Sequence, residues 1–276
     1  MKQRVVLVTG ASSGIGKATA TLFAQKGYIT YAAARRRETF AELRARACHP
    51  LHVDVTDEAS MIAAVQEIEA QHGAVDILVN NAGYGQAGPL EELALSAMRQ
   101  QFETNVFGPL RMSQLVLPGM RGKRWGRIIN VSSVAGAVTM MGTGAYTMSK
   151  HAVECFSDVL RYEVRPFGVD VITIQPGGVS TNFTSVEEEM FGKGEPNSPY
   201  AKFRENVART LHQGASENRL ILKPEQVAQA ILVAATAPRP RKRYRVGMLA
   251  KMLPRVHDIL PEPVWDRMVA RIYSMD

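Results

Sequence analysis

Short apolar runs alternate with helix-like stretches over the first 180 residues. The runs predicted to be strands are 5–8, 28–33, 51–53, 75–79, 127–131 and 169–174, and helical spacing marks 17–26 and 58–71. Strands that alternate with helices favour a parallel sheet covered on both faces, and right-handed crossovers make such a sheet doubly wound. The pattern therefore predicts an α/β fold whose ligands lie at the carboxyl ends of the strands.

The remaining chain departs from this alternation. Residues from about 182 to 223 carry mixed charge with glycines and prolines, which predicts a flap over a site. A helix over 224–237 and a last strand over 244–246 follow. The tail, about 248–276, has partial helical spacing that Pro254, Pro261 and Pro263 break. It is interpreted as a C-terminal cap on the core, with a substrate-pocket wall or a weak membrane-surface contact as alternatives.

Length and composition are those of a globular protein. The 276 residues are 46% hydrophobic and 21% charged, and no linker, low-complexity segment or further repeat divides them, so one domain over 1–276 is expected. No apolar run predicts a transmembrane segment, and Val5–Val8 is too short for a signal peptide. The two cysteines, Cys48 and Cys155, are expected to be reduced thiols of a cytoplasmic protein.

The chain is basic, with a net charge of +7. Much of this charge lies in the stretch 239–245, which is interpreted as a solvated loop before the last strand. No nucleic-acid-binding motif accompanies it, so no nucleic-acid partner is expected.

A glycine-rich turn, Thr9–Gly16, follows the first strand and opens the first helix. Gly10 allows a tight turn, Gly14 lets the backbone approach a pyrophosphate, and Gly16 lets the helix pack close to the sheet. Free amides at the helix start, together with the helix dipole, favour phosphate. The turn, which also holds Ser12, Ser13 and Ile15, therefore predicts dinucleotide binding.

The residues after the second strand indicate which dinucleotide binds. A free ribose 2′-hydroxyl would call for an acidic residue here. The sequence instead reads Ala34-Arg35-Arg36-Arg37, and the first acid is Glu38. Arg35, with Arg36 as a second candidate, can pair with a 2′-phosphate through its planar donor fork. The predicted cofactor is therefore NADP(H) rather than NAD(H).

Candidate catalytic groups lie further along the chain. Tyr146 and Lys150 stand at i and i+4, on one face of a predicted helix. A free tyrosine has a pKa near ~10, and a neighbouring ammonium lowers it. Ser132-Ser133 follow one strand, and Asn80-Asn81-Ala82-Gly83 follow another, which places both at the ligand-binding edge of the sheet.

In this order the motifs resemble the short-chain dehydrogenases/reductases. The matching pieces cover residues 5 to about 185 and are Thr9–Gly16, Asp54-Val55, Asn80–Gly83, Asn105, Ser133, Tyr146, Lys150 and Pro176-Gly177 through Thr181. The resemblance implies a single Rossmann-like, doubly wound domain with a seven-stranded parallel sheet. It also implies a hydride transfer between the nicotinamide and a carbonyl or alcohol.

The resemblance implies roles for the catalytic residues. Tyr146 is the general acid/base, and Ser133, chosen over Ser132 for its thirteen-residue separation from Tyr146, hydrogen-bonds the substrate oxygen. Lys150 binds the ribose and lowers the tyrosine pKa, and Asn105 holds a water of the proton relay. The implied cofactor contacts are Asp54 and Val55 at the adenine, Asn81, Ala82 and Gly83 along the cofactor, and Pro176, Gly177, Val179 and Thr181 beside the nicotinamide.

No metal is expected, because none of the six histidines clusters with cysteine or carboxylate at ligand spacing. The segments 160–169 and 176–183 resemble the hydroxysteroid and retinol dehydrogenase branch. The expected pocket walls are largely apolar, which suits a bulky hydrophobic ketone, steroid-like or retinoid-like compound: Tyr84, Gln86, Met140, Met141, Phe183, Met190 and Phe191.

Two other functions stay open. One is the same chemistry on a polar substrate, either a sugar or an acyl thioester. The other is an NADPH-sensing protein without catalysis, which would have no need of an intact Ser133, Tyr146 and Lys150. The resemblance further implies a homodimer or homotetramer, built through the helices that follow Glu91 and Tyr146.

Overall fold

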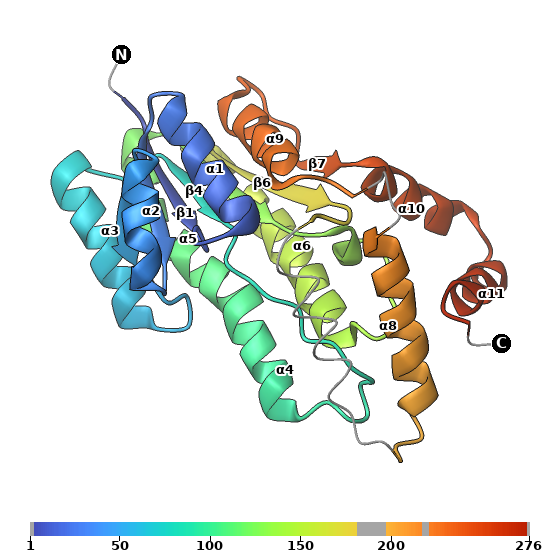
Figure 1. Cartoon of the computed structure of the whole chain (residues 1–276). Helices are drawn as coiled ribbons and strands as arrows, with labels where there is room; N and C mark the ends of the chain where they lie inside the picture. Colours follow the sequence, from blue (N-terminus) through green and yellow to red (C-terminus); the bar gives the residue numbers. More distant parts are fainter. Residues whose placement is uncertain (1–2, 181–196, 217–220, 275–276) are drawn as a thin grey trace.

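Seven parallel strands form one sheet in the order β3-β2-β1-β4-β5-β6-β7 (Figure 1). The computed structural model describes residues 3–180, 197–216 and 221–274, without the side chains of 211–216. The strands are β1 (Val5–Thr9), β2 (Ile29–Ala34), β3 (His49–His52), β4 (Ile77–Asn80), β5 (Gly126–Val131), β6 (Val169–Pro176) and β7 (Arg243–Val246). The predicted doubly wound α/β sheet is confirmed, because the order reverses between β1 and β4.

Helices cover both faces of the sheet. One face packs on α3 (Glu58–His72), α5 (Gly108–Lys123) and α6 (Gly144–Val164). The other packs on α1 (Gly14–Gln25), α2 (Phe40–Ala45) and α9 (Pro224–Thr236). Outside these layers lie α4 (Leu95–Phe102), α8 (Ala201–Ser216), α10 (Met248–Ile259) and α11 (Glu262–Ile272), with the short turns η1 (Arg37–Thr39), η2 (Glu103–Phe107), η3 (Val134–Gly136) and η4 (Arg165–Phe167).

The alternation of side chains along β1 feeds two separate cores. Val5 and Leu7 belong to the core under α3, α5 and α6, whereas Val6 and Val8 belong to the core under α1 and α9. Successive side chains of a strand point to opposite faces, and here both faces are covered. A continuous apolar run is therefore what a central parallel strand requires.

Buried hydrogen bonds between side chains join the two central strands to helices. Asn80 Nδ2 donates to Asn130 Oδ1 over 2.8 Å, and Asn130 Nδ2 donates to Ser157 Oγ over 2.8 Å. Asn80 Nδ2 also reaches Ser113 Oγ at 3.2 Å. This amide ladder, made of Asn80, Asn130, Ser113 and Ser157, links β4 and β5 to α5 and α6. It lies directly before the segments that hold Asn81 and Ser133.

Two expectations about the last third of the chain need correction. Pro254 does not break a helix: it lies inside α10, where it is buried, so packing offsets the backbone hydrogen bond that proline removes. Pro261 does end the run and stands directly before α11, whereas Pro263 lies in the first turn of α11, where the missing amide hydrogen has no helical partner to lose. The expected flap includes α8, and 181–196 and 217–220 lie outside the described residues.

The basic stretch is only partly the expected solvated loop. Arg243 and Arg245 belong to β7 and are half-buried, and Arg243 pairs with Glu154 over 2.7 Å and with Asp158 over 2.6 Å. Two acceptors on α6 thus draw Arg243 into the sheet edge. Among the described residues, no helix is long and apolar enough to cross a bilayer.

Replacing Asn130 tests the amide ladder. Asn130→Ala removes the two buried hydrogen bonds that join Asn130 to Asn80 and to Ser157, so we expect the free energy of unfolding to fall by about 2–3 kcal/mol. Urea denaturation monitored by circular dichroism measures it. Gln100→Ala, at an exposed position of α4, is the control. Equal midpoints for the two variants would show that the ladder does not support the fold.

Candidate active site

The turn after β1 has the backbone that a phosphate requires. Gly10 and Gly14 adopt positive φ angles of 65° and 52°. A Cβ on Gly16 would lie 2.3 Å from the Gly10 carbonyl oxygen, so only glycine fits there. Ser13 precedes α1 and makes no capping hydrogen bond with its side chain. The first amides of α1 are therefore not taken by that side chain and suit an anionic group.

The segment after β4 is tied to this turn. Asn81 Nδ2 donates to the carbonyl oxygens of Thr9, over 3.0 Å, and Gly10, over 3.3 Å. In return, Thr9 Oγ1 accepts hydrogen bonds from the amides of Asn81 and Ala82. Two predicted cofactor motifs, joined by contacts between residues 72 apart in the sequence, thus form one unit at the point where the strand order reverses.

Arginines border the same turn. Arg36 Nη2 donates to Ser12 Oγ over 3.3 Å, and Arg35 Nη1 lies 3.9 Å from Asp54 Oδ2. Partial burial of Asp54 opposes ionisation, but hydrogen bonds from Thr56 and the charge of Arg35 lower the pKa of this carboxyl overall. Two exposed guanidinium groups thus border the glycine turn, and the Asp54 carboxylate lies beside Arg35. The side chain of Val55 packs in the core.

Two buried amides hold the backbone that runs on from Gly83. Asn105, in the π-helical turn η2, accepts from the Tyr84 amide over 3.1 Å and donates to its carbonyl over 2.9 Å. Gln101, one turn earlier, donates to the same carbonyl over 2.7 Å and accepts from the Gln86 amide over 2.6 Å. Asn105 Nδ2 also donates to Ser149 Oγ of α6. Asn105 therefore already has partners on both sides of its amide.

Lys150 lies buried beneath Tyr146 on α6. Its Nζ donates to the Val131 carbonyl over 2.8 Å and lies 5.6 Å from the centre of the Tyr146 ring. Burial lowers the pKa of this ammonium to about 8, although the negative charge of Glu154 raises it. The side chain is therefore mostly cationic at neutral pH and titrates just above it.

The two serines after β5 point in different directions. Ser132 is buried, and its Oγ lies within 2.8 Å of where a Cβ on Gly136 would be. Ser133 is half-buried, and its Oγ accepts from the Ala135 amide at the start of η3. Because that bond uses an oxygen lone pair, the Ser133 hydroxyl can still donate to a ligand. This geometry favours Ser133 over Ser132.

Sequence reasoning missed Gln101, Ser149, Glu154 and Arg243. Glu154 stands one helical turn after Lys150 and is buried, with Arg243 Nε at 2.7 Å and Thr173 Oγ1 at 3.2 Å. A glutamate four residues after Lys150 on the same helix face was the available signal. Nothing in the sequence pairs it with an arginine 89 residues later.

Several of the residues expected to line a substrate pocket lie near α8 and the end of the chain. Met141 packs with Ala87, with Val207 of α8 and with Tyr273 in one small apolar cluster. Met140 and Gln86 are half-buried, and Val179 pairs with Leu222. Pro176 ends β6, and the Gly177 amide donates to the Val246 carbonyl. Thr181, Phe183, Met190 and Phe191 lie outside the described residues.

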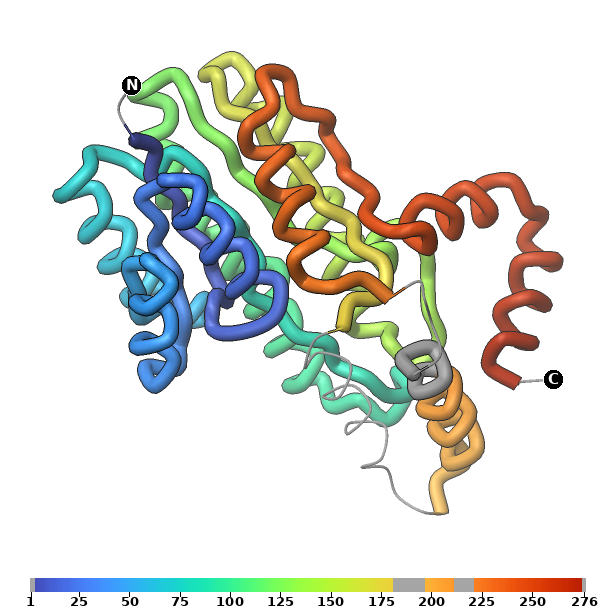
Figure 2. The backbone as a smooth tube through the Cα atoms, turned by 45° about the horizontal axis from the view of Figure 1, so that its top comes forward, coloured from blue at the N-terminus to red at the C-terminus, as the bar shows by residue number. Residues whose placement is uncertain are grey.

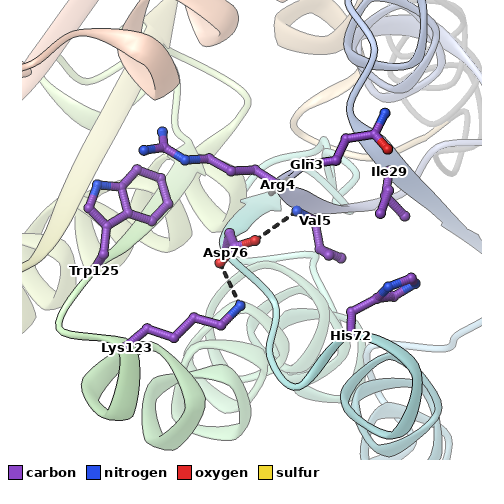
Figure 3. A pocket seen from close by; sticks show the side chains of 8 residues that line it. All are labelled: Gln3, Arg4, Val5, Ile29, His72, Asp76, Lys123 and Trp125. Carbon is purple, nitrogen blue, oxygen red and sulfur yellow. Dashed lines mark hydrogen bonds and ion pairs between the residues drawn. The ribbon is translucent and has the colours of Figure 1, made fainter. Parts of the chain in front are cut away.

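A cavity of about 350 Å³ lies at the opposite, amino-terminal edge of the sheet (Figure 3). There Lys123 pairs with Asp76 over 2.8 Å, and Asp76 accepts from the Val5 amide. Arg4 stacks over the Trp125 ring at 3.7 Å. In this cavity Lys123 and Asp76 satisfy each other's charge, and the cavity lies at the edge of the sheet opposite to Tyr146. Among the described residues, no group of histidine, cysteine and carboxylate side chains could hold a metal.

Comparisons agree with this geometry. The family model described as short chain dehydrogenase matches residues 4–191. The 3-ketodihydrosphingosine reductase of Bacteroides thetaiotaomicron is 36% identical over 92% of this chain and 91% of its own. The NADPH-dependent 3-dehydrocapnine reductase of Ornithobacterium rhinotracheale is 34% identical over 99% and 97%. A short-chain dehydrogenase structure from Streptomyces avermitilis has a TM-score of 0.81 and 32% identity, covering 100% and 97%.

The family match spans well over half of the chain, and the relatives match it almost end to end. The chain belongs to the short-chain dehydrogenases/reductases, a family of oxidoreductases.

Proposed function

We propose that the protein is an NADPH-dependent oxidoreductase that transfers a hydride between the nicotinamide and a carbonyl or alcohol. One observation carries the proposal: Lys150 is held, buried and cationic, beneath Tyr146, and Ser133 follows β5 with a hydroxyl free to donate. These groups can serve as a proton donor (Tyr146), a charge that lowers the pKa of that donor (Lys150) and a hydrogen-bond donor to the substrate oxygen (Ser133), all at the carboxyl edge of the sheet.

The residues present fit an NADP(H) molecule. The amides of α1 and the glycine turn would hold the pyrophosphate, and Arg35 and Arg36 would pair with the 2′-phosphate. Asp54, Asn81, Ala82 and Gly83 would line the rest, with Pro176, Gly177, Val179 and Thr181 beside the nicotinamide. When bound, the cofactor supplies or accepts the hydride. A relative whose name says that it is NADPH-dependent supports this choice.

The protein's own groups move the proton and place the oxygen. Ser133 donates a hydrogen bond to the substrate oxygen. Tyr146 gives its phenolic proton to that oxygen in reduction and takes it back in oxidation. The Lys150 ammonium stabilises the phenolate, which lowers the tyrosine pKa toward the working range. Asn105 is proposed to position a water molecule that returns a proton to Tyr146.

The proposed substrate is a hydrophobic carbonyl compound. Met140, Met141 and Gln86 are the described residues expected to line the substrate pocket, and methionine adapts to irregular apolar ligands. A relative named as a 3-ketodihydrosphingosine reductase supports this class. A polar substrate, or nucleotide sensing without catalysis, remains the competing function.

The assembly is proposed to be a homodimer or homotetramer, because α4, η2 and α6 carry exposed apolar side chains: Leu95, Phe107, Met148, Val159 and Tyr162.

Tyr146→Phe separates catalysis from binding. Without the phenolic proton we expect the turnover of apolar ketones to fall at least ~1,000-fold. Turnover is measured as the oxidation of NADPH at 340 nm. The Kd for NADPH, measured by fluorescence titration, should change less than about threefold because the ring is kept. Turnover close to wild type would remove Tyr146 from the mechanism. Wild-type protein that binds NADPH but reduces no carbonyl would favour the sensing function.

Arg35→Asp tests cofactor choice. Removing the guanidinium and restoring an acid should weaken NADPH binding by roughly 10- to 100-fold, the value of one or two charge-assisted hydrogen bonds, and improve NADH. Ratios of kcat/KM for the two cofactors measure it. Arg37→Asp, two residues later and exposed, controls for net charge. An unchanged ratio in the Arg35 variant would refute the phosphate contact.

Lys150→Met tests the buried charge without any substrate. The pKa of Lys150 is about 8 in the folded protein, below the value of ~10.4 expected in the unfolded chain. Between these values the unfolded chain binds more protons, so this residue's contribution to stability rises with pH by up to ~1.4 kcal/mol per unit. Urea denaturation from pH 7 to 10 should show this rise in wild type relative to Lys150→Met. Parallel curves would place the Lys150 pKa near normal.

A further inference from the structure

Helix α10 is apolar on two sides, and the chain covers only one of them. On the inner side, Ala250 and Leu253 pack with Trp265 of α11 and Val134 of η3. On the outer side, Met248 and Met252 are 56% and 52% exposed, and Ile259 is 80% exposed. Ile259 is the most exposed large apolar side chain among the described residues. An uncovered apolar face of this kind indicates an interaction surface.

The outer side chains form one row with basic flanks. Positions 248, 252, 255 and 259 recur at i, i+4, i+7 and i+11, so they fall on one side of the helix. Arg255 lies in that row, and Lys251 borders it, both exposed. A row that combines three apolar side chains with long cationic ones fits a helix that lies in the interface of a membrane, because such cations can extend to the headgroups.

Charge argues for an acidic partner. The two charged side chains of the outer face of α10, Lys251 and Arg255, are both cations, although the stretch 248–276 as a whole holds four lysines and arginines against four aspartates and glutamates. On α11, the exposed Arg267 and Arg271 are balanced by the exposed Glu262 and Asp266, so the charge of this surface comes from α10. A second copy of the α10 face would set Lys251 and Arg255 against like charges, whereas anionic lipid headgroups complement them.

The surface lies beside the substrate side of the proposed site. Helix α10 contacts η3, which directly follows Ser133. Tyr273, after α11, shares an apolar cluster with Ala87 and Met141. In both views α10 and α11 project beyond β7 at the margin of the molecule (Figures 1 and 2). A flat partner bound to this surface would therefore also face the substrate side of the proposed site.

We propose that the outer face of α10, formed by Met248, Lys251, Met252, Arg255 and Ile259, docks on an anionic lipid bilayer. The apolar row enters the boundary between headgroups and acyl chains, and Lys251 and Arg255 meet lipid phosphates. A long-chain carbonyl substrate then reaches the site from the bilayer. Docking stands without the proposed function, and only this delivery of substrate rests on it.

Vesicle flotation of the full chain tests docking. We expect binding to vesicles of phosphatidylcholine with about one third phosphatidylglycerol to exceed binding to pure phosphatidylcholine at least ~10-fold, and high salt to reduce it. Ile259→Glu should lower binding ~10-fold or more. Val233→Glu, which adds the same charge at a 47% exposed position of α9, should leave it unchanged. Lys251→Glu with Arg255→Glu should abolish the preference for the anionic lipid.

Circular dichroism and the thermal midpoint confirm that each variant is folded. Wild-type protein that stays with the buffer fraction at every composition would overturn docking. So would equal losses from Ile259→Glu and Val233→Glu. If wild type ignores vesicles and Ile259→Glu instead lowers the molar mass in light scattering, the face is a contact between copies and the proposal is wrong.

Substrate delivery has its own readout. With NADPH, Ile259→Glu should reduce a long-chain ketone embedded in anionic vesicles more slowly than wild type, yet reduce a short water-miscible ketone at the wild-type rate. Equal rates on the embedded ketone, from a variant that no longer floats, would overturn delivery and leave docking standing. If no carbonyl is reduced by any variant, the proposed function fails, and flotation still decides docking.

Discussion

The amide ladder in the centre of the sheet is the constraint on which the site depends. Strands β4 and β5 are buried on both faces, so the polar groups that follow them must be placed by partners inside the protein. Asn80 donates to Asn130, and through Ser113 and Ser157 the two amides fasten their strands to α5 and α6. Asn81 directly follows Asn80, and Ser133 comes three residues after Asn130. The ladder therefore helps to fix the positions of the segment bound to the glycine turn and of the Ser133 hydroxyl.

Electrostatics at the site follow from that burial. Lys150 is taken out of water on α6, and its hydrogen bond to the Val131 carbonyl offsets only part of the desolvation, so its pKa falls to about 8. Glu154 opposes a larger fall. Glu154 is in turn held by Arg243 of β7, which also pairs with Asp158. The edge strand thus takes part in setting the charge beneath Tyr146, although it contributes no group to the proposed chemistry.

Local patterns predicted the fold and much of the site. The strands were predicted within about two residues of their observed bounds because buried parallel strands are short apolar runs, and glycine positions in the turn follow from backbone geometry alone. Pairings across long sequence distances could not be read this way. Arg243 looked like a loop arginine because Glu154 and Asp158 are distant in sequence, and Pro254 looked like a helix end because burial outweighed its local cost. Gln101 carried no signal, since only the fold brings it to the Tyr84 and Gln86 backbone.

The two ends of the site differ in how they are supported. The turn after β1, Asn81 and the segment before Lys150 rest on the central strands and their two large cores. Met141, α8, α10 and α11 pack instead in two small clusters at the margin. A substitution in a small cluster disturbs few neighbours, so the tail can change while Ser133, Tyr146 and Lys150 keep their positions. That separation explains why the outer face of α10 can carry a further role without altering the surroundings of Tyr146 and Lys150.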